Sequence, residues 1–377
     1  MLFVFWICAF LVLYVYAGYP LLLASGLLGK RRVARIACIE PPVSVVIPAH
    51  NEEKVIRKKL LNLLSQNYPL EKMQILVGND GSSDGTAAAV SEFLDFGVEL
   101  VTGNSPRGKS SIQNAVVQRA HGEILVFTDA DCLLPRNAMR SIVQYFTDPE
   151  VGLVTGCASF VNQGETSTIE GEGLYWKYER WLRKQESDRG LLAMASGSLF
   201  AMRSMLWRRL DPDVGDDFAL PLQVAKAGFR NVMETRFSAA TVLTQNQPQS
   251  MFQMKTRIIS KDLRGLLRHS ACLNPRRVGR VAVGLWSHKM LRWAIPYFLV
   301  ALLVSNAFLA GQPFYAIALL AQLSFYVLAA LGLLLSKKRM RIPLTAASSF
   351  CVVNLAALFG TLHCFAVPSD GHWKPVR

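Results

Sequence analysis

The sequence predicts an α/β domain with a mainly parallel sheet, accompanied by interfacial helices and about four transmembrane helices. Short β-branched runs alternate with helical patterns over the first third of the chain, which is typical of parallel βαβ units. Long uncharged apolar segments lie near both ends, and the chain of 377 residues is 51% hydrophobic. Its mean hydropathy of +0.25 is high for a wholly soluble protein.

The first apolar segment is predicted to be an uncleaved membrane anchor. Residues 1–29 carry no charged side chain, and 2–28 is long enough to cross a bilayer. A secretory signal would have a basic start and would lead to a small-residue cleavage site. Here the basic residues follow the apolar run, between positions 30 and 35, which predicts an anchor with this cluster on the cytoplasmic side.

Three further spans are predicted at 294–310, 313–335 and 342–366, and the basic run 337–341 marks a cytoplasmic loop. We therefore expect a multi-pass protein of the inner (plasma) membrane, with residues 30 to about 290 in the cytoplasm. The predicted parts are 1–29 for the first helix, 30–245 for the α/β domain, 246–292 for interfacial amphipathic helices, 293–367 for three transmembrane helices and 368–377 for a tail.

The net charge of +14 does not indicate a nucleic-acid partner, because the chain has no zinc-ligand spacing, RNP-like stretch or basic helix-turn-helix pattern. Basic residues gather instead near the predicted membrane edges, at 30–35, 264–280 and 337–341, which suits anionic membrane lipids and phosphorylated ligands. The seven cysteines form no CxxC pair and are expected to be reduced.

The strand-like runs are 43–47, 74–77, 98–101 and 123–127, and the helical patterns between them are 52–66, 86–94 and 110–120. In an open parallel sheet, ligands bind beyond the carboxyl ends of the strands, so the residues after each run are candidates for a site. These are Pro48-Ala-His-Asn-Glu-Glu53, Gly78-Asn-Asp-Gly-Ser-Ser-Asp-Gly-Thr86, Thr102-Gly-Asn-Ser-Pro-Arg-Gly-Lys-Ser110 and Asp129-Ala-Asp131. One polar turn is ordinary, because about 40% of residues in a domain are irregular, but four in succession favour a binding site.

The motifs PAHNEE, NDGSSDGT, RGKSSIQNA and TDADCLLP, in this order, resemble the opening half of family 2 glycosyltransferases with the GT-A (Rossmann-like) fold. The resemblance covers about residues 41–240, and the flanking helices are similar to those of membrane-integrated bacterial polysaccharide and glycolipid synthases. It implies an inverting hexosyltransferase that moves a sugar from a nucleotide-sugar donor, expected to be a UDP-sugar, to a lipid-linked or polysaccharide acceptor. The product would be an exopolysaccharide or a glycolipid made at the cytoplasmic face, and partner proteins for its export or polymerisation stay open.

Asp129 and Asp131 suit a divalent cation such as Mg²⁺ or Mn²⁺, which binds carboxylate oxygens and neutralises a departing diphosphate. The resemblance implies that Asp131 reaches the metal, while Asp129 contacts the donor and shares the metal site. The alternative is a strand-terminal turn that binds no metal.

The resemblance implies five further donor-binding residues, which are Pro48, Glu52, Asp80, Lys109 and Arg257. Asp80 is expected beside the nucleoside base and Glu52 near the ribose, although an acid in the first turn of a helix is also common. Lys109 opens a helix and suits a phosphate through its ammonium and the helix N-terminus, and the alternative is a lone exposed lysine. Arg257 ends the run FQMKTR, which resembles the Gln-X-X-Arg-Trp segment of processive synthases but lacks its tryptophan, so processivity stays open.

The catalytic base is expected in Asp213-Val-Gly-Asp-Asp217, which resembles the Thr-Glu-Asp segment of the family. Asp217 is the predicted base for the acceptor hydroxyl, and Asp216 is the alternative within the pair. Adjacent carboxylates raise each other's pKa, which suits such a role. A single base opposite the leaving diphosphate means direct displacement with inversion, and an N-capped helix start is the structural alternative.

The acceptor side is predicted from Gly197, Trp176, His288 and Arg292. Gly197 lies in the small-residue run ASGSL, which resembles the floor of the acceptor pocket in the family. Trp176 belongs to an aromatic run at helical spacing, which favours packing of a helix at least as much as sugar stacking. His288 and Arg292 are expected at a lipid-facing acceptor entrance, or as snorkelling residues at the membrane edge.

The alternative function is a non-catalytic membrane scaffold or receptor that keeps a degenerate transferase domain. Such a relic would be expected to lose carboxylates of the metal or the base, whereas Asp129, Asp131 and Asp217 are all present. A nucleotidyltransferase would be expected to have a glycine-rich basic loop after the first strand, where this chain has PAHNEE.

Overall fold

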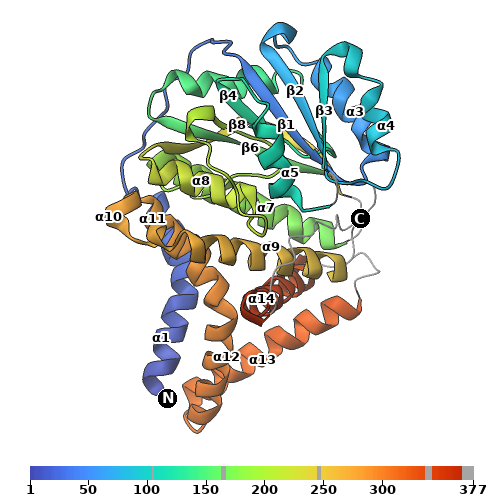
Figure 1. The fold of residues 1–377 in the computed structure, drawn as a ribbon. Helices are drawn as coiled ribbons and strands as arrows, with labels where there is room; N and C mark the ends of the chain where they lie inside the picture. The colour runs from blue at the N-terminus through green and yellow to red at the C-terminus, as the bar shows by residue number, and fades with distance from the viewer. Residues whose placement is uncertain (104–105, 163–166, 244–247, 336–341, 367–377) are drawn as a thin grey trace.

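The computed structural model describes residues 1–103, 106–162, 167–243, 248–335 and 342–366. Figure 1 shows an α/β domain at one end of the molecule and long helices at the other, with α9 (Pro248–Arg268) running between them. Helix α9 packs against α14 (Ile342–Ala366), the last of the long helices. The α/β domain therefore rests on the apolar helices through α9.

Within these described ranges the sheet has eight strands, in the order β3-β2-β1-β4-β7-β6-β8-β5. Their bounds are β1 Val43–Ala49, β2 Met73–Asn79, β3 Val98–Thr102, β4 Ile124–Phe127, β5 Cys132–Leu133, β6 Val151–Asn162, β7 Phe200–Arg203 and β8 Arg230–Leu243. Strand β1 is parallel to β2 and β4, β2 is parallel to β3, and β6 is parallel to β8. Strand β7 is antiparallel to β4 and β6, and β5 is antiparallel to β8. The predicted α/β fold with a mainly parallel sheet is confirmed, and the four predicted strands are β1 to β4.

The helices of this domain cover both faces of the sheet. They are α3 Glu53–Leu64, α4 Thr86–Ser91, α5 Lys109–Val117, α6 Ala138–Val143, α7 Ser167–Arg189 and α8 Asp216–Lys226. Val45 of β1 packs in one core with Leu60 of α3, whereas the next residue, Val46, packs in the other core with Ile112 of α5. All seven positions of β1 are buried, as expected for a parallel strand that is covered on both faces.

A glycine lets α5 approach the sheet closely. A Cβ at Gly78 of β2 would lie 2.7 Å from the side chains of Ile112 and Val116, so a larger residue would push α5 away. Gly78 lies next to the carboxyl end of β2, and this contact fixes α5 there. The N-terminus of α5, where Lys109 lies, is therefore held near the strand ends.

Among the residues that the structure describes, four helices are long and apolar enough to cross a membrane, by length and composition. They are Leu2–Ala24, Val281–Leu309, Pro313–Leu334 and Leu344–Ala366. The first joins α1 (Leu2–Leu13) and α2 (Tyr19–Ala24) through a π-helical turn, and the third is α13 (Pro313–Leu334). The structure thus contains the four apolar helices that the sequence predicts.

One of these helices begins earlier than the predicted start at 294. Helices α11 (Val281–Gly284) and α12 (Leu291–Leu309) are joined by the π-helical segment Leu285–Met290 into one helix, and the short α10 (Pro275–Val278) precedes it. The polar residues His288, Lys289 and Arg292 do not end the helix, because each pairs with a carboxylate of the adjoining α/β domain or α9.

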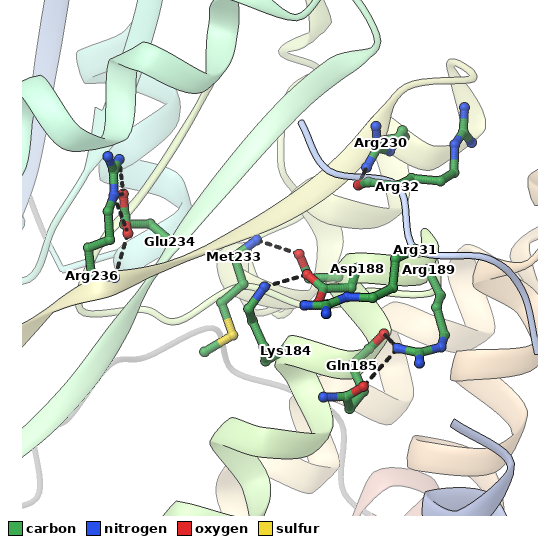
Figure 2. A network of polar contacts seen from close by, with 11 residues as sticks. Arg31, Arg32, Lys184, Gln185, Asp188, Arg189, Arg230, Met233, Glu234 and Arg236 are labelled. Carbon is green, nitrogen blue, oxygen red and sulfur yellow. Dashed lines mark hydrogen bonds and ion pairs between the residues drawn. The ribbon is translucent and has the colours of Figure 1, made fainter. Parts of the chain in front are cut away.

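The basic segment after the first apolar helix is bound to the α/β domain. Arg31 ion-pairs with Asp188 of α7 at 2.7 Å, and Arg32 ion-pairs with Glu150 at 2.8 Å. Figure 2 shows Arg31 beside the carboxylate of Asp188, and Arg230 donating a hydrogen bond to the backbone carbonyl of Arg32. Protein carboxylates therefore bind part of the basic cluster that the sequence assigns to the cytoplasmic membrane edge.

Candidate active site

The candidate site lies at the carboxyl ends of β1, β2 and β4. The strand register pairs Ala49 at the end of β1 with Asn79 at the end of β2, and Val46 with Phe127 at the end of β4. Because these strands are parallel and in register, the loops that follow them leave the sheet side by side. The motifs after the three strands are therefore brought together, as the sequence predicts.

The first two loops are bonded to each other. The backbone N–H of Asp80 donates to the carbonyl of Ala49 at 2.9 Å, and the backbone N–H of Glu52 donates to the hydroxyl of Thr86 at 2.8 Å. The side chains of Glu52 and Asp80 are buried, as is Pro48 near the end of β1. These residues form a fixed wall of the site, and their contact with a donor stays a prediction.

The carboxylate of Asp80 shapes the start of α5. It accepts hydrogen bonds from the backbone N–H groups of Arg107 at 2.9 Å and Gly108 at 2.8 Å. Gly108 is the N-cap of α5 and has a φ of 93°, a conformation that favours glycine. A carboxylate has about four acceptor positions, so these two bonds leave others for a nucleoside base.

Lys109 connects the motif after β4 with the motif that starts α8. Its Nζ lies 2.8 Å from Oδ1 of Asp129 and 3.3 Å from Oδ2 of Asp216. The carboxylates around it outweigh burial and raise the pKa of Lys109 above its usual range, so the ammonium stays charged. Gln113, one turn further along α5, donates to the same Oδ2 of Asp216 at 2.7 Å. Helix α5 therefore holds the start of α8.

Asp129 and Asp131 occupy the tight connection between β4 and β5. The backbone N–H of Cys132 donates to the carbonyl of Asp129 at 3.3 Å, which closes the turn. Burial, followed by the charge of Asp129, raises the pKa of Asp131 to about 6. Two carboxylates that repel each other at a partly buried strand end form an environment that favours a bound cation.

Asp217 is partly buried and lies in the first turn of α8. Burial raises the pKa of its carboxyl to about 7, with smaller contributions from the charges of Asp216 and Asp262. Its backbone carbonyl accepts a hydrogen bond from the N–H of Ala195 at 2.7 Å, which ties α8 to the ASGSL run. Asp217 therefore exchanges a proton in the neutral pH range and lies next to the predicted acceptor floor.

Gly197 marks the point where the predicted residues meet. A Cβ at this glycine would lie 3.5 Å from Oδ2 of Asp129, 3.6 Å from Oδ2 of Asp217 and 3.8 Å from Nζ of Lys109. These three side chains come from separate motifs, and all of them approach the same small space. Ser196, beside Gly197, is fixed by a hydrogen bond from its N–H to the hydroxyl of Thr155 at 2.8 Å.

Two charged residues behind Asp217 were not expected from the sequence. A Cβ at Gly215 would lie 3.0 Å from Oδ1 of Asp217 and 3.6 Å from Oδ1 of Asp262, so the two carboxylates flank one glycine. Lys289 pairs with Asp262 at 3.1 Å, and burial raises the pKa of Asp262. The sequence signal is weak: Asp262 interrupts the apolar face of α9, between Ile259 and Leu266.

His288 is buried and Arg292 is partly buried in a network of ion pairs, and their predicted place at the acceptor entrance stays a prediction. The ring of His288 is only 3% exposed and lies 2.8 Å from Glu186 and 3.0 Å from Glu179, both on α7. Arg292 pairs with Glu179 at 2.9 Å, and the hydroxyl of Tyr19 donates to Glu186 at 2.8 Å. Tyr19 belongs to the first apolar helix, and His288 and Arg292 belong to the second, so the network joins both helices to α7. A buried charged side chain requires a partner of opposite charge, which the carboxylates of α7 provide.

Trp176 belongs to α7 and Arg257 belongs to α9. Both helices lie on the side of the α/β domain that faces the apolar helices (Figure 1). The ammonium of Lys255 lies 5.5 Å from the centroid of the Trp176 ring. Burial lowers the pKa of Arg257, and it also lowers the pKa of Lys261, one turn further along α9. Their predicted contacts with acceptor and diphosphate stay predictions.

One further buried residue of this region, Lys59, has no counterpart among the predicted site residues. Its ammonium donates to the hydroxyl of Thr128 and to the carbonyl of Cys132, on either side of the two aspartates. The sequence signal is a lysine on the apolar face of α3, between Ile56 and Leu63.

Residues 44–210 match the family model described as "Glycosyl transferase family 2". The chain is 30% identical over 229 residues to a Bacillus subtilis protein described as "Probable glycosyltransferase YdaM", a match that covers 56% of this chain and 52% of that protein. It is 26% identical over 162 residues to "Beta-monoglucosyldiacylglycerol synthase" of Synechocystis sp., which covers 42% of this chain and 34% of that protein. The chain thus spans about half or less of the length of these curated relatives.

The chain also shares its fold with a solved structure. This is the mannosyltransferase PcManGT from Pyrobaculum calidifontis, determined in complex with GDP-Man and Mn²⁺. The TM-score is 0.74 at 24% identity, and the likeness covers 96% of this chain and 99% of that chain. Residues 44–210 therefore match glycosyltransferase family 2, and the chain as a whole shares the fold of PcManGT.

Proposed function

We propose that this chain is a metal-dependent, inverting enzyme that moves a hexosyl group from a nucleotide-sugar donor to a lipid-linked or polysaccharide acceptor at the membrane surface. The observation that supports the proposal most is the approach of Asp129, Asp217 and Lys109 to one point at Gly197. A carboxylate for the metal and donor, a base for the acceptor and a cation for the leaving diphosphate are the groups that a single displacement needs.

Asp217 is the proposed general base. Its pKa of about 7 lets the ionised carboxylate take a proton from the acceptor hydroxyl near neutral pH. Asp216 is a poorer candidate, because Gln113 and Lys109 already bind its Oδ2. As the proton moves to Asp217, the hydroxyl oxygen attacks the anomeric carbon and the bond to the donor diphosphate breaks, which inverts the anomeric configuration.

A divalent cation fits beside Asp129 and Asp131. Within the ranges that the structure describes, no cluster of three or more Asp, Glu, His or Cys side chains is placed to hold a metal. Two carboxylates that act together with donor phosphates are, however, a usual set for Mg²⁺ or Mn²⁺. The bound metal would neutralise charge on the leaving diphosphate. That PcManGT was solved with Mn²⁺ and GDP-Man supports the same class of cofactor and donor.

The remaining donor contacts are assigned by position. Lys109 opens the nine-residue helix α5, where both its ammonium and the helix N-terminus suit a phosphate. Glu52 and Asp80, with Pro48, would line the nucleoside pocket, and Arg257 would reach the diphosphate from α9. A UDP-sugar is our expected donor, and a GDP-sugar is the alternative that the fold relative supports.

The acceptor is proposed to reach the site along the membrane. The α/β domain rests on the apolar helices through α9 (Figure 1), so a lipid acceptor would not have to leave the bilayer. The description of the Synechocystis relative as a glycolipid synthase supports this class of acceptor. We place the catalytic domain on the cytoplasmic side of the plasma membrane, because basic residues follow the first helix and flank the last.

The test uses the full chain purified in detergent, a panel of UDP- and GDP-sugars, and lipid extract as acceptor, with and without Mg²⁺ or Mn²⁺. Mass analysis of the products should show a metal-dependent addition of hexose for at least one donor. A single added sugar would indicate a glycolipid enzyme, and a ladder of lengths would indicate a polymerase. Donor binding without turnover under every condition would support the alternative of a non-catalytic scaffold or receptor.

A further inference from the structure

Lys59 is a buried cation in a place where an apolar side chain is expected. It lies on α3 between Ile56 and Leu63, which are in the core, and its own relative exposure is 0%. Removing an ammonium from water lowers stability unless nearby groups compensate, so lysine is rarely found fully buried without a partner. The neighbouring Lys58 is exposed to solvent, so the helix offers a matched pair of lysines.

The ammonium of Lys59 bonds both ends of the turn that carries the two aspartates. Its Nζ donates to Oγ1 of Thr128 at 2.7 Å and to the backbone carbonyl of Cys132 at 2.6 Å. Thr128 directly precedes Asp129, and Cys132 directly follows Asp131. One side chain from α3 therefore fixes the distance between the two ends of the turn.

A further hydrogen bond connects Thr128 to the predicted acceptor floor. The hydroxyl of Thr128 donates onward to the carbonyl of Ser198 at 2.8 Å, beside Gly197. On the next turn of α3, Asn62 accepts from the N–H of Leu134 at 2.8 Å and donates to its carbonyl at 2.8 Å. Helix α3 thus holds the whole segment from Thr128 to Leu134 against the sheet.

The aspartates also act on the charge of Lys59. Burial lowers the pKa of Lys59 to about 8, while the carboxylates of Asp129 and Asp131 act in the opposite direction. A neutral side chain of the same length would fill the space and provide neither the two hydrogen bonds nor this charge.

We propose that Lys59 is a positioning residue for the metal and donor site: its two hydrogen bonds hold the Asp129–Asp131 turn in the shape that binds a divalent cation. This proposal rests on the proposed function, because it assigns the cation to these two aspartates. Lys59 touches neither donor nor acceptor, and it acts through Thr128 and Cys132.

If the proposal is right, replacing Lys59 weakens metal binding without lowering the stability of the fold. Lys59→Met removes the hydrogen bonds and the charge but keeps an unbranched side chain in the core, so the fold should be retained and the melting temperature should be unchanged or higher. Thr128→Val removes one of the two bonds and leaves the charge in place. Lys58→Met is the matched control on the exposed face of the same helix.

The experiment titrates Mn²⁺ into the full chain in detergent, with UDP or GDP present, and follows free Mn²⁺ by electron paramagnetic resonance. We expect Lys59→Met to weaken Mn²⁺ binding at least tenfold, Thr128→Val to weaken it by a smaller factor, and Lys58→Met to leave it at the wild-type value. Thermal unfolding of each variant without metal is measured on the same preparation.

Wild-type Mn²⁺ affinity in folded Lys59→Met would overturn the proposal, even if its melting temperature falls, because Lys59 would then be structural only. If Lys59→Met does not fold, Thr128→Val decides, and unchanged Mn²⁺ affinity in that variant overturns the proposal. A wild-type chain that binds no Mn²⁺ would overturn both this proposal and the metal site of the proposed function. If the wild-type chain binds Mn²⁺ and only the results with the variants differ from those expected, the metal site of the proposed function still stands.

Discussion

Replacing Gly197 by alanine tests whether Asp129, Asp217 and Lys109 surround a reacting centre. The added methyl carbon would lie between 3.5 and 3.8 Å from their polar atoms, which are ordinary van der Waals distances. Gly197 is not among the glycines of this chain with positive φ, so its backbone conformation suits alanine. The folded chain should therefore accept the methyl group without strain.

Stability and activity should then move in opposite directions. Because alanine restricts the unfolded chain more than glycine does, Gly197→Ala should leave the free energy of unfolding unchanged or raise it by about 0.4–1 kcal/mol. The methyl group would occupy the space where donor and acceptor meet, and a displacement of about 1 Å at a reacting centre lowers the rate about 100-fold. A loss of that size in kcat/KM corresponds to about 2.7 kcal/mol of transition-state free energy.

The assay combines thermal unfolding in detergent with initial rates of sugar transfer. Gly311→Ala is the control, because a Cβ at Gly311, between α12 and α13, would meet nothing within 4 Å. It should show the same unchanged or slightly raised stability as Gly197→Ala, but keep the wild-type rate. Wild-type kcat/KM in Gly197→Ala would refute the assignment of this point as the reacting centre. A fall in melting temperature that accounts for the lost activity would refute the steric reasoning.

Three further predictions follow from the charged groups of the site and its support. The transfer rate should rise with pH and level off above about pH 7. Asp217 must lose its proton to act as base, and its pKa is raised to about 7. A rate that is flat from about pH 5 to 8 would argue against Asp217 as the base. Chelation of divalent cations should stop sugar transfer. Asp131→Asn should raise the Mn²⁺ concentration needed for the half-maximal rate at least about tenfold, and an unchanged Mn²⁺ concentration would contradict the metal site. Glu186→Ala removes one of the two carboxylates that pair with His288 and the acceptor of the Tyr19 hydroxyl, and it should lower the free energy of unfolding by about 3–5 kcal/mol. Glu150→Ala removes an exposed carboxylate that pairs with Arg32 and Arg230, and it should change this free energy by less than about 1 kcal/mol. Equal melting temperatures for the two variants would contradict the network.

The parallel half of the sheet follows from local sequence pattern. Strands β1 to β4 are short β-branched runs separated by helical patterns, and parallel strands bring the polar residues at their carboxyl ends together. The pairing of β7 between β4 and β6 is different, because it joins Val126 to Ala201 and Thr155 to Phe200 across long stretches of chain. A local pattern does not specify such a register, so that half of the sheet required the structure.

The same distinction applies to the site. The roles proposed for Asp129, Asp131 and Asp217 come from local motifs, but the approach of Asp217 to Asp129 depends on the path of the chain through Gly197. Lys59 resembles a surface lysine in the sequence, because its partners Thr128 and Cys132 are 69 and 73 residues away.

His288 resembles a membrane-edge residue in the sequence for the same reason, because its partner Glu186 is 102 residues away on α7. The burial of a charged or titratable side chain is decided by partners that are distant in the sequence. The structure is therefore needed to distinguish such a residue from one at the surface.

Asp217 is proposed to accept the proton of the acceptor hydroxyl at a metal-bound donor. The most direct test of this role is to measure donor binding and sugar transfer for Asp217→Asn on one preparation, with Mn²⁺ present. We expect the variant to bind the nucleotide sugar as the wild-type chain does and to transfer the sugar about 100-fold to 10,000-fold more slowly. Transfer at the wild-type rate by Asp217→Asn would contradict the role of Asp217 as base.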